Sequence, residues 1–411
     1  MNAANEDFKA DLCIVGGAGH VGLPLAIVFA SKGLKVMIHD VNSGAWETIR
    51  TGRMPFMEEG AEPLLKESLK KRRLAFSNDP AALRGVPNVI ITIGTPLDEY
   101  FNPVFKGFKQ FLEASVPYMS EARLIVLRST VAPGTTDWLQ RELRQRGLAA
   151  RLAFCPERIV QGFAIRELQD LPQIVGGTTE QAEREAAKLF GLITGEVVTL
   201  SPLEAEFAKI FCNVYRYVQF AIANQFYMVA DSAGVDYSRI LEACKRHYPR
   251  MQGMPGAGFT AGPCLLKDTM TLVAFTRNQF SLGHAAMMVN EGLILHLVEK
   301  MEREYDLPNT TVGLLGMAFK AESDDTRASL SYKLKKLLTV RARKVLTTDP
   351  YVTTDPDILP LEQVIERSDL FVLCTTHRQY GKVDLRGKPL IDVWGYRRPG
   401  GDGEKPSLQE V

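Results

Sequence analysis

The sequence predicts an α/β protein in which two Rossmann-like, doubly wound domains are joined by a long central helix and a helical middle domain. Three observations lead to this prediction. Short apolar runs alternate with helical stretches over the first 200 residues, which is typical of a parallel sheet covered by helices. The stretch from Leu203 to Gly234 contains no proline and has apolar residues at helical spacing. From about Thr310 the alternation of strands and helices begins again.

The first domain is predicted over residues 1–200, and its short apolar segments are expected to form buried parallel strands. A helix is expected between the first two strands, ending near Lys32. The expected strands are Leu12–Val15, Lys35–His39, Val89–Ile93, Leu124–Leu127 and the segments RLAFCPE and PQIVGG.

A glycine-rich loop follows the first predicted strand. Residues 17–22, GAGHVG, have the spacing G-x-G-x-x-G, whose glycines permit a tight turn, close approach to a pyrophosphate, and close helix–strand packing. Asp40 ends the second strand, where a carboxylate binds ribose hydroxyls and repels the 2′-phosphate of NADP. Glycines alone would also suit a mononucleotide site or a turn that packs against the sheet. Together these features predict NAD binding by Gly17, Gly19, His20, Val21, Gly22 and Asp40.

Two further loops follow strands of the same predicted sheet, at the edge where such sheets bind ligands. The first is IGTP, which contains Thr95, and the second is STVAPGTT, which contains Thr130. We expect both threonines to lie near the cofactor, with the Thr130 hydroxyl within reach of the catalytic centre. The alternative is that these hydroxyls cap the helices that follow.

The middle domain is predicted over residues 201–305. Its long helix has surplus apolar surface, which we expect to form a homodimer interface. The segments KDTMTLVAFTRN and HAAMMVNEGLILHLVEKMERE are expected to continue as helices. A second strand–helix domain is predicted over residues 306–400, and the Gly- and Pro-rich tail, 401–411, is expected to be mobile.

Composition favours an ordinary globular protein, for which the cytoplasm is the expected location. The 411 residues carry a net charge near +1, which gives no indication of nucleic-acid binding. We find no apolar run of about 18 residues that would predict a membrane span, and the polar N-terminus does not resemble a secretory signal. The six cysteines have no metal-site spacing and do not suggest a disulfide framework, so no metal site is expected.

One cysteine has unusual neighbours. Cys264 follows a Gly-Pro pair at the expected start of a helix, a position that favours the thiolate form of a cysteine. Lys267 and Asp268 lie three and four residues later, on the same helical face. This arrangement suits a nucleophile, although most cysteines are simply small apolar residues of a core.

The order of motifs along the chain resembles the NAD-dependent UDP-glucose/GDP-mannose dehydrogenases, also called nucleotide-sugar 6-dehydrogenases, over residues 10–395. The resemblance implies a four-electron oxidation, in which the C6 hydroxymethyl group of a UDP-sugar becomes a carboxylate and two NAD⁺ are reduced. A thiolate adds to the intermediate aldehyde, and loss of hydride leaves a thioester that water hydrolyses. The motifs are GAGHVGLP, PFMEEG, IGTP, STVAPGTT, CPERIVQGFAIREL, IVGG, AEFAKIFCNVYR, GFTAGPCLLKD and GLLGMAFKAESDDTRAS.

The resemblance also implies a set of catalytic residues. In this set a cysteine is the nucleophile and a glutamate acts as general base. A lysine and an asparagine four residues apart stabilise developing oxyanions, an aspartate assists, and a threonine positions water. The residues that match these roles are Cys264, Glu157, Lys209, Asn213, Asp268 and Thr130.

Cofactor and substrate ligands are implied in the same way. Lys267 and Arg327 are expected near the cofactor, and the loop GFTAGP is expected to wrap the sugar. Arg250 is similar to an arginine that reaches the partner subunit's site in a homodimer. The expected substrate ligands are Glu157, Arg158, Lys209, Asn213, Arg250, Phe259, Gly262, Phe319 and Lys320.

Departures from the family pattern bear on the substrate. Gln161 stands where glucose-type enzymes have a second carboxylate, so Glu157 is expected to act alone as the base. CPER and TTHRQY (Thr375–Tyr380) are closer to the N-acetylhexosamine branch, whereas CLLKD is closer to the glucose branch. The expected substrate is UDP-N-acetylmannosamine or UDP-N-acetylglucosamine, followed by UDP-glucose and then GDP-mannose.

Two other functions remain open on the sequence. A two-electron hydroxyacid or 6-phosphogluconate-type dehydrogenase also places a Rossmann domain before a long helix with a Lys and an Asn four residues apart. Such an enzyme needs neither a nucleophilic cysteine nor a second nucleotide-type domain. The other alternative is a non-catalytic sensor of NAD or nucleotide sugar.

Overall fold

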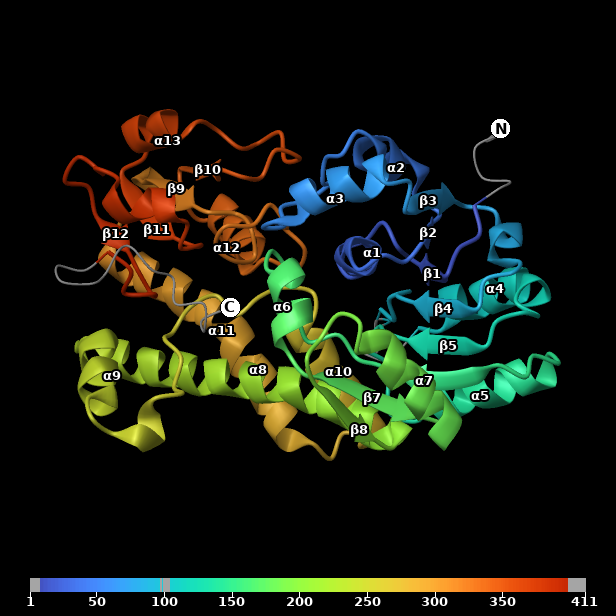
Figure 1. Cartoon of the computed structure of the whole chain (residues 1–411). Coiled ribbons are helices and arrows are strands. Elements are labelled where there is room, and N and C mark those ends of the chain that lie inside the picture. The colour runs from blue at the N-terminus through green and yellow to red at the C-terminus, as the bar shows by residue number, and fades with distance from the viewer. Residues whose placement is uncertain (1–7, 97, 99–103, 398–411) are drawn as a thin grey trace. The chain divides into compact units, whose positions relative to one another are not determined.

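The computed structural model describes residues 8–96, 98 and 104–397, so the predicted mobile tail lies outside the described residues. The chain divides into two compact units, Met1–Cys212 and Asn213–Val411 (Figure 1). The boundary between them falls inside the long helix α8, Pro202–Ser232. The four domain segments given by the sequence stay a prediction.

The first unit contains an eight-stranded sheet in the order β3-β2-β1-β4-β5-β6-β7-β8. Strands β1 to β6 are parallel to one another, as the alternation of strands and helices predicts. The pair β7 and β8 differs, because β7 runs antiparallel to β6. The strands are β1 Leu12–Val15, β2 Val36–His39, β3 Leu74–Ser77, β4 Asn88–Ile91, β5 Leu124–Leu127, β6 Arg151–Phe154, β7 Gln173–Gly177 and β8 Val197–Leu200.

Helices cover both faces of this sheet, because successive strand side chains point to opposite sides. Leu12 and Ile14 enter one apolar core with α1, α3, α6 and α7, whereas Cys13 and Val15 enter a second core with α4 and α5. The helices are α1 Gly22–Ser31, α2 Ser43–Arg50, α3 Ala61–Lys70, α4 Lys106–Ser115, α5 Thr135–Gln145, α6 Ala164–Asp170 and α7 Glu180–Phe190.

The predicted long helix is confirmed as α8, with Pro202 at its first position, where proline is tolerated. It ends before Gly234, which has φ +68°, a left-handed conformation that suits glycine. Near its start, buried Glu206 accepts hydrogen bonds from the backbone N–H of Gly134 at 2.6 Å and of Thr136 at 2.7 Å. This carboxylate therefore caps α5 and fixes the start of α8 against the sheet of the first unit.

The second unit contains a smaller, four-stranded parallel sheet in the order β10-β9-β11-β12. Its apolar core joins this sheet to α11 and α12. The elements after α8 are α9 Tyr237–Lys245, α10 Leu265–Phe275, α11 Ser281–Glu304, β9 Thr311–Leu315, α12 Leu330–Thr339, β10 Lys344–Thr348, α13 Leu361–Arg367, β11 Leu370–Leu373 and β12 Leu390–Ile391. Every helix in the described part of the chain is too short or too polar to cross a lipid bilayer.

Candidate active site

The glycine loop connects β1 to α1 at the carboxyl edge of the first sheet. A Cβ atom on Gly17 would lie 2.7 Å from the carbonyl oxygen of Ile14, and one on Gly22 would lie 2.5 Å from that of Gly16. Both glycines are therefore required by the packing of strand against helix. A Cβ atom on Gly19 would have its nearest neighbour, the carbonyl oxygen of Gly16, 3.5 Å away, so a ligand can approach the backbone of Gly19 closely.

Asp40 follows β2 and is tied to this loop. Its Oδ2 atom accepts the N–H of Ala18 at 2.9 Å, and its Oδ1 atom accepts the N–H of Asn42 at 2.9 Å. The carboxylate is half-buried, which leaves lone pairs for ribose hydroxyls. Among the described residues, no side chain caps α1 and no acidic residue lies in its first turn, so its positive end suits a pyrophosphate. The loop fits a dinucleotide.

Replacing Asp40 with alanine is expected to raise the KM for NAD about tenfold and to weaken discrimination against NADP, because ribose contacts and 2′-phosphate repulsion are both lost. Steady-state kinetics with each cofactor measure this. Asp11→Ala is a matched control, since Asp11 also accepts one backbone N–H, from Lys35, but precedes β1 at the opposite edge of the sheet. An unchanged preference for NAD in Asp40→Ala would refute the assignment.

The loops after β4, β5 and β6 lie at the same edge. Thr95 donates its hydroxyl hydrogen to the carbonyl of Thr130 at 2.7 Å, so the two predicted threonines are adjacent. Glu157 follows β6, and its Oε1 atom accepts the N–H groups of Arg158 at 2.6 Å and Ile159 at 2.7 Å. The Arg158 guanidinium donates to the carbonyl of Pro172. The carboxylate of Glu157 is thus held rigidly at the sheet edge.

Buried Arg128 at the end of β5 is a residue that the sequence did not indicate. Its guanidinium forms an ion pair with Oε2 of Glu157 at 2.5 Å, and its side chain is 1% exposed. The same group donates to Oε1 of Gln173 at 2.5 Å and to the carbonyl of Cys155 at 3.1 Å, and it lies over the ring of Phe190. Arg128 is therefore the main support of the predicted base.

Gln161 is directed at the glycine loop. Its Nε2 atom lies 3.1 Å from Nδ1 of His20, whose ring centroid is 4.0 Å from that of Phe56. The position that holds a second carboxylate in glucose-type enzymes is thus next to the phosphate-binding loop.

Helix α8 carries the predicted lysine and asparagine one turn apart. Lys209 belongs to the first unit and is 8% exposed. Asn213 belongs to the second unit and is 7% exposed. Residues four apart on a helix share one face, so both side chains project from the same side of α8. Their burial distinguishes them from an ordinary exposed helix pair.

The second unit brings together the predicted cysteine, asparagine and aspartate. Cys264 is exposed and is the N-cap residue of α10, and its carbonyl accepts the N–H of Asp268 at 2.9 Å. The carboxylate of Asp268 is fully buried and accepts hydrogen bonds from Asn213 at 2.5 Å and from Lys267 at 2.5 Å. Asp268 thus fixes the amide of Asn213 relative to the helix that begins at Cys264.

A positively charged side chain, that of Arg327, interacts with Cys264. Hydrogen bonding to Asp325 is the largest cause that raises the pKa of Arg327, and the negative charges of Asp325 and Cys264 raise it further. By contrast, burial raises the pKa of the Cys155 thiol to about 12, and burial also raises the pKa values of Cys13 and Cys374. These three cysteines have the ordinary core environment.

The loop that contains Gly262 is anchored by a buried amide network. Asn224 accepts the N–H of Gly258 at 2.9 Å and donates to Thr260 at 3.3 Å and to Asn290 at 2.9 Å. Gly262 has φ +100°, and a Cβ atom there would lie 2.8 Å from the ring of Phe319. The backbone of Gly262 therefore lies directly against the ring of Phe319, in a conformation that only glycine adopts without strain.

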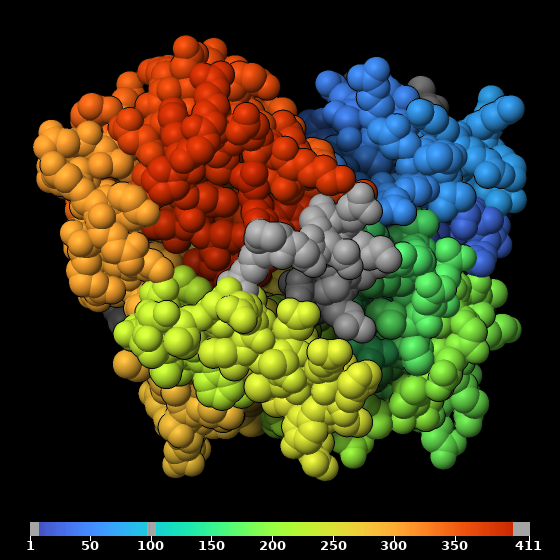
Figure 2. Space-filling view, turned by 90° about the vertical axis from the view of Figure 1, so that its left-hand side faces the viewer, coloured from blue at the N-terminus to red at the C-terminus, as the bar shows by residue number. Residues whose placement is uncertain are grey.

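The remaining predicted substrate ligands differ in exposure. Phe259 is 4% exposed and belongs to the apolar core of its unit, so a sugar would meet its backbone rather than its ring. Arg250 lies in the exposed segment after α9, coloured yellow in Figure 2, and its Nε atom donates to the hydroxyl of Tyr248 at 2.9 Å. Lys320 is 8% exposed in the turn after β9, next to Phe319.

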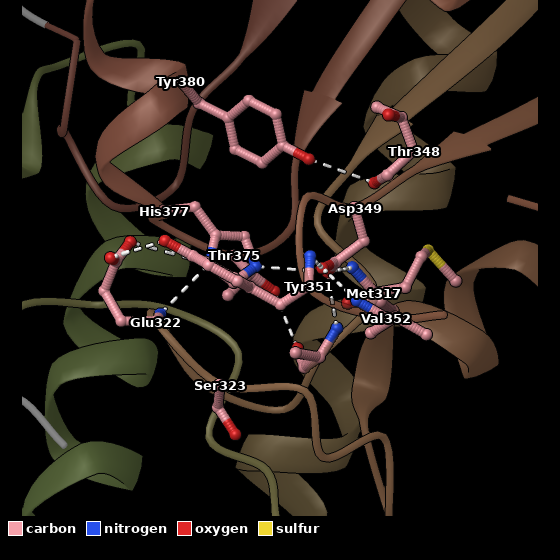
Figure 3. Close-up of polar contacts among 12 residues, drawn as sticks. Met317, Glu322, Ser323, Thr348, Asp349, Tyr351, Val352, Thr375, His377 and Tyr380 are labelled. Atoms are coloured by element: carbon pink, nitrogen blue, oxygen red, sulfur yellow. Dashed lines mark hydrogen bonds and ion pairs between the residues drawn. The ribbon is translucent and has the colours of Figure 1, made fainter. Parts of the chain in front are cut away.

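A buried carboxylate holds that turn. The carboxylate of Asp349 follows β10 and accepts the N–H of Met317 at 2.6 Å and of Ala318 at 3.0 Å (Figure 3). Burial raises the pKa of Asp349, but hydrogen bonds from His377 and from backbone N–H groups outweigh burial and lower it to about 2. The stabilisation it contributes is therefore present above about pH 4, its unfolded pKa, and is lost as the pH falls through 2.

Comparisons with known proteins agree with this arrangement. Three models of the UDP-glucose/GDP-mannose dehydrogenase family match: the NAD binding domain at residues 10–194, the central domain at 203–292 and the UDP binding domain at 313–397. UDP-N-acetyl-D-mannosamine dehydrogenase of Pyrococcus horikoshii is 31% identical, over 92% of this chain and 93% of that protein.

Two solved structures share the fold over the same extent. The structure of a UDP-D-ManNAc dehydrogenase from Pyrococcus horikoshii superposes with a TM-score of 0.86 at 29% identity, covering 96% of each chain. A UDP-glucose dehydrogenase from Pyrobaculum islandicum superposes with a TM-score of 0.84 at 26% identity, also over 96% of each chain. The chain therefore belongs to the UDP-glucose/GDP-mannose dehydrogenase family and is an NAD-dependent nucleotide-sugar dehydrogenase.

Proposed function

We propose that the protein oxidises the C6 hydroxymethyl group of a UDP-N-acetylhexosamine to a carboxylate, with Cys264 as the covalent nucleophile. The observation that carries this proposal is the cluster in the second unit, where exposed Cys264 begins the helix that holds Asp268 against Asn213. A two-electron dehydrogenase does not need this cluster. The family assignment and the intact set of catalytic residue types give no support to a non-catalytic sensor.

The chemistry requires two oxidations, each of which removes two electrons. NAD⁺, when bound at the glycine loop and Asp40, supplies the hydride acceptor. After the first oxidation, the Cys264 thiolate forms a C–S bond with the aldehyde carbon, and the carbonyl oxygen takes up a proton to give a thiohemiacetal. Oxidation of this adduct leaves a thioester. Water then breaks the C–S bond, which releases the carboxylic acid and the thiol.

The side chains divide these tasks. Asn213 donates hydrogen bonds and Lys209 carries positive charge, so both suit an oxygen atom that becomes negative. Glu157 suits the activation of the hydrolytic water, because Arg128 and two backbone N–H groups fix its orientation. Thr130 suits the positioning of that water through its hydroxyl.

Relatives support an N-acetylated sugar as the first choice. The Pyrococcus horikoshii relative is named for UDP-N-acetyl-D-mannosamine, and the motifs CPER and TTHRQY favour the same branch. UDP-glucose is the second choice, since the Pyrobaculum islandicum structure is nearly as similar in fold. The six cysteines all lie among the described residues and form no disulfide there, which accords with the reducing cytoplasm as the site of action.

Absorbance measurements of NADH formation test this proposal. The purified chain is supplied with UDP-N-acetylmannosamine, UDP-N-acetylglucosamine, UDP-glucose or GDP-mannose, and the product acid is measured. We expect two NADH per sugar and the highest kcat/KM for an N-acetylated UDP-sugar. One NADH per molecule of substrate would instead support the two-electron alternative, and binding without NADH would support a sensor.

We further propose that α8 forms a homodimer interface. In the second unit its side chains Tyr215, Ile222, Phe226 and Val229 recur at helical spacing and are 42% to 65% exposed.

Phe226→Glu is expected to convert dimers to monomers at micromolar concentration and to lower activity, because Arg250 is proposed to serve the partner's site. Analytical ultracentrifugation measures the first effect. Val340→Glu, at another exposed apolar position, is the control, and a dimer that survives Phe226→Glu would contradict the proposal.

A further inference from the structure

Asp349 in the second sheet corresponds in position to Asp40 in the first. Asp40 follows β2, which pairs in parallel with β1, and it accepts an N–H of the turn after β1. Asp349 follows β10, which pairs in parallel with β9, and it accepts two N–H groups of the turn after β9. The two carboxylates thus perform the same local task of holding the first turn of their sheets.

The two carboxylates differ in what remains available to a ligand. The side chain of Asp349 is 0% exposed, whereas Asp40 is half-buried. A carboxylate offers about four lone-pair sites, and Asp349 has five donors, so none remains for ribose hydroxyls. The donors are the N–H groups of Met317, Ala318, Tyr351 and Val352 and Nε2 of His377. Asp349 is an internal anchor for the turn.

His377 links this anchor to the far end of the turn. Its imidazole is fully buried, and Nε2 lies 3.1 Å from Oδ2 of Asp349. Nδ1 accepts the backbone N–H of Glu322 at 3.0 Å (Figure 3). Since Asp349 accepts through both oxygens, the proton of the imidazole resides on Nε2, and Nδ1 is the acceptor. The ring therefore bridges a carboxylate and a loop amide.

The segment that His377 holds is backbone-strained. Glu322 has φ +52°, a left-handed conformation that costs a residue with a side chain on the order of 1–2 kcal/mol. Three hydrogen bonds hold Glu322 in this conformation. Its N–H donates to Nδ1 of His377, its Oε2 atom accepts the Tyr351 hydroxyl at 2.7 Å, and its Oε1 atom accepts the N–H of Arg378 at 2.9 Å. Without them the turn would relax.

Phe319 and Lys320 lie between the two fixed ends of this turn. Asp349 holds Met317 and Ala318 on one side, and His377 holds Glu322 on the other. Phe319 in turn packs against Gly262 of the proposed sugar loop. A shift at Glu322 would therefore displace both proposed substrate ligands, whereas the glycine loop lies in the other unit.

We propose that His377 is a positioning residue for the UDP-sugar, which sets substrate affinity through the Nδ1 bond to Glu322 and touches no reacting atom. This inference rests on the proposed function, because it takes Phe319 and Lys320 as substrate ligands. A change at His377 is therefore expected to alter the KM for the sugar nucleotide and to leave kcat nearly constant.

Two substitutions at His377 separate its two hydrogen bonds. In His377→Gln the side-chain N–H₂ reaches the position of Nε2, so donation to Asp349 is kept and the acceptor for Glu322 is lost. In His377→Asn the side-chain oxygen reaches the position of Nδ1, so the acceptor for Glu322 is kept. We expect Gln to weaken UDP binding about tenfold and Asn to retain affinity within about threefold. The kcat and the KM for NAD should stay within about twofold in both.

Calorimetric titration of the full chain with UDP, together with kinetics on the best UDP-sugar, measures these effects. Thermal melting checks that each variant is folded. Tyr351→Phe is a second variant, which removes only the hydrogen bond from the Tyr351 hydroxyl to Glu322 and should weaken UDP binding about threefold. The inference is overturned if Gln binds UDP as tightly as the wild type, or if Asn is impaired as much as Gln. Failure of the wild type to bind UDP would instead overturn the proposed function, and the inference with it.

Discussion

Replacing Cys264 with serine is expected to lower the rate of acid formation by about a thousandfold or more, while UDP and NAD bind within about twofold of the wild type. A serine hydroxyl is not ionised near neutral pH and is a much weaker nucleophile than a cysteine thiolate, so it adds poorly to the aldehyde. Without a stable adduct, the aldehyde is oxidised slowly, and the second NADH does not form at a useful rate.

Cys244→Ser is the matched control, because Cys244 is also an exposed cysteine but lies on α9. It should retain full activity. Mass spectrometry of the wild type quenched during turnover should show a covalent sugar adduct on the peptide that contains Cys264, and none on the peptide that contains Cys244. Wild-type acid formation by Cys264→Ser would exclude a cysteine mechanism.

Replacing Arg128 with methionine is expected to destabilise the first unit by about 3–5 kcal/mol and to reduce activity at least about a hundredfold. The guanidinium is 1% exposed and is bound to Glu157, Gln173 and the carbonyl of Cys155. Its removal leaves Oε2 of Glu157, Oε1 of Gln173 and the carbonyl of Cys155 without their guanidinium donor. Glu157 then loses its charged partner, and only its Oε1 atom is still held, by the N–H groups of Arg158 and Ile159.

Urea unfolding followed by tryptophan fluorescence measures the loss. In a Trp394→Phe background the signal comes from Trp46 and Trp138, both in the first unit. Arg151→Met is the control, because the ion pair of Arg151 with Glu185 at 2.7 Å is partly exposed and should contribute at most about 1 kcal/mol. Equal destabilisation by the two substitutions would show that burial gives Arg128 no special role.

Local sequence features were sufficient to predict the main elements that build the site. The first strand, the glycine loop and Asp40 belong to one βαβ unit, and all three lie where they were predicted. The start of α10 at Cys264 was also predicted, because a Gly-Pro pair followed by an apolar helical pattern marks a helix N-terminus. The roles of the individual site residues came from the family resemblance and stay predictions.

Features that depend on distant partners were missed. Arg128 has the sequence signature of a surface residue, and only the fold places Glu157, 29 positions later, against it. The antiparallel direction of β7 depends on the path of the chain after α6, and the pattern of apolar residues does not indicate that path. Strand β8 was missed because its side chains are half-buried or exposed, so it lacks the apolar run of a central strand.

The amide network of Asn224 and Asn290 has a consequence for the loop that we propose to bind the sugar. These fully buried side chains join α8, α11 and the loop around Gly258 through bonds within the chain. The entropy of ordering that loop is therefore lost when the protein folds, not when a ligand arrives. Capture of the sugar should proceed at the rate of encounter, with little unfavourable entropy.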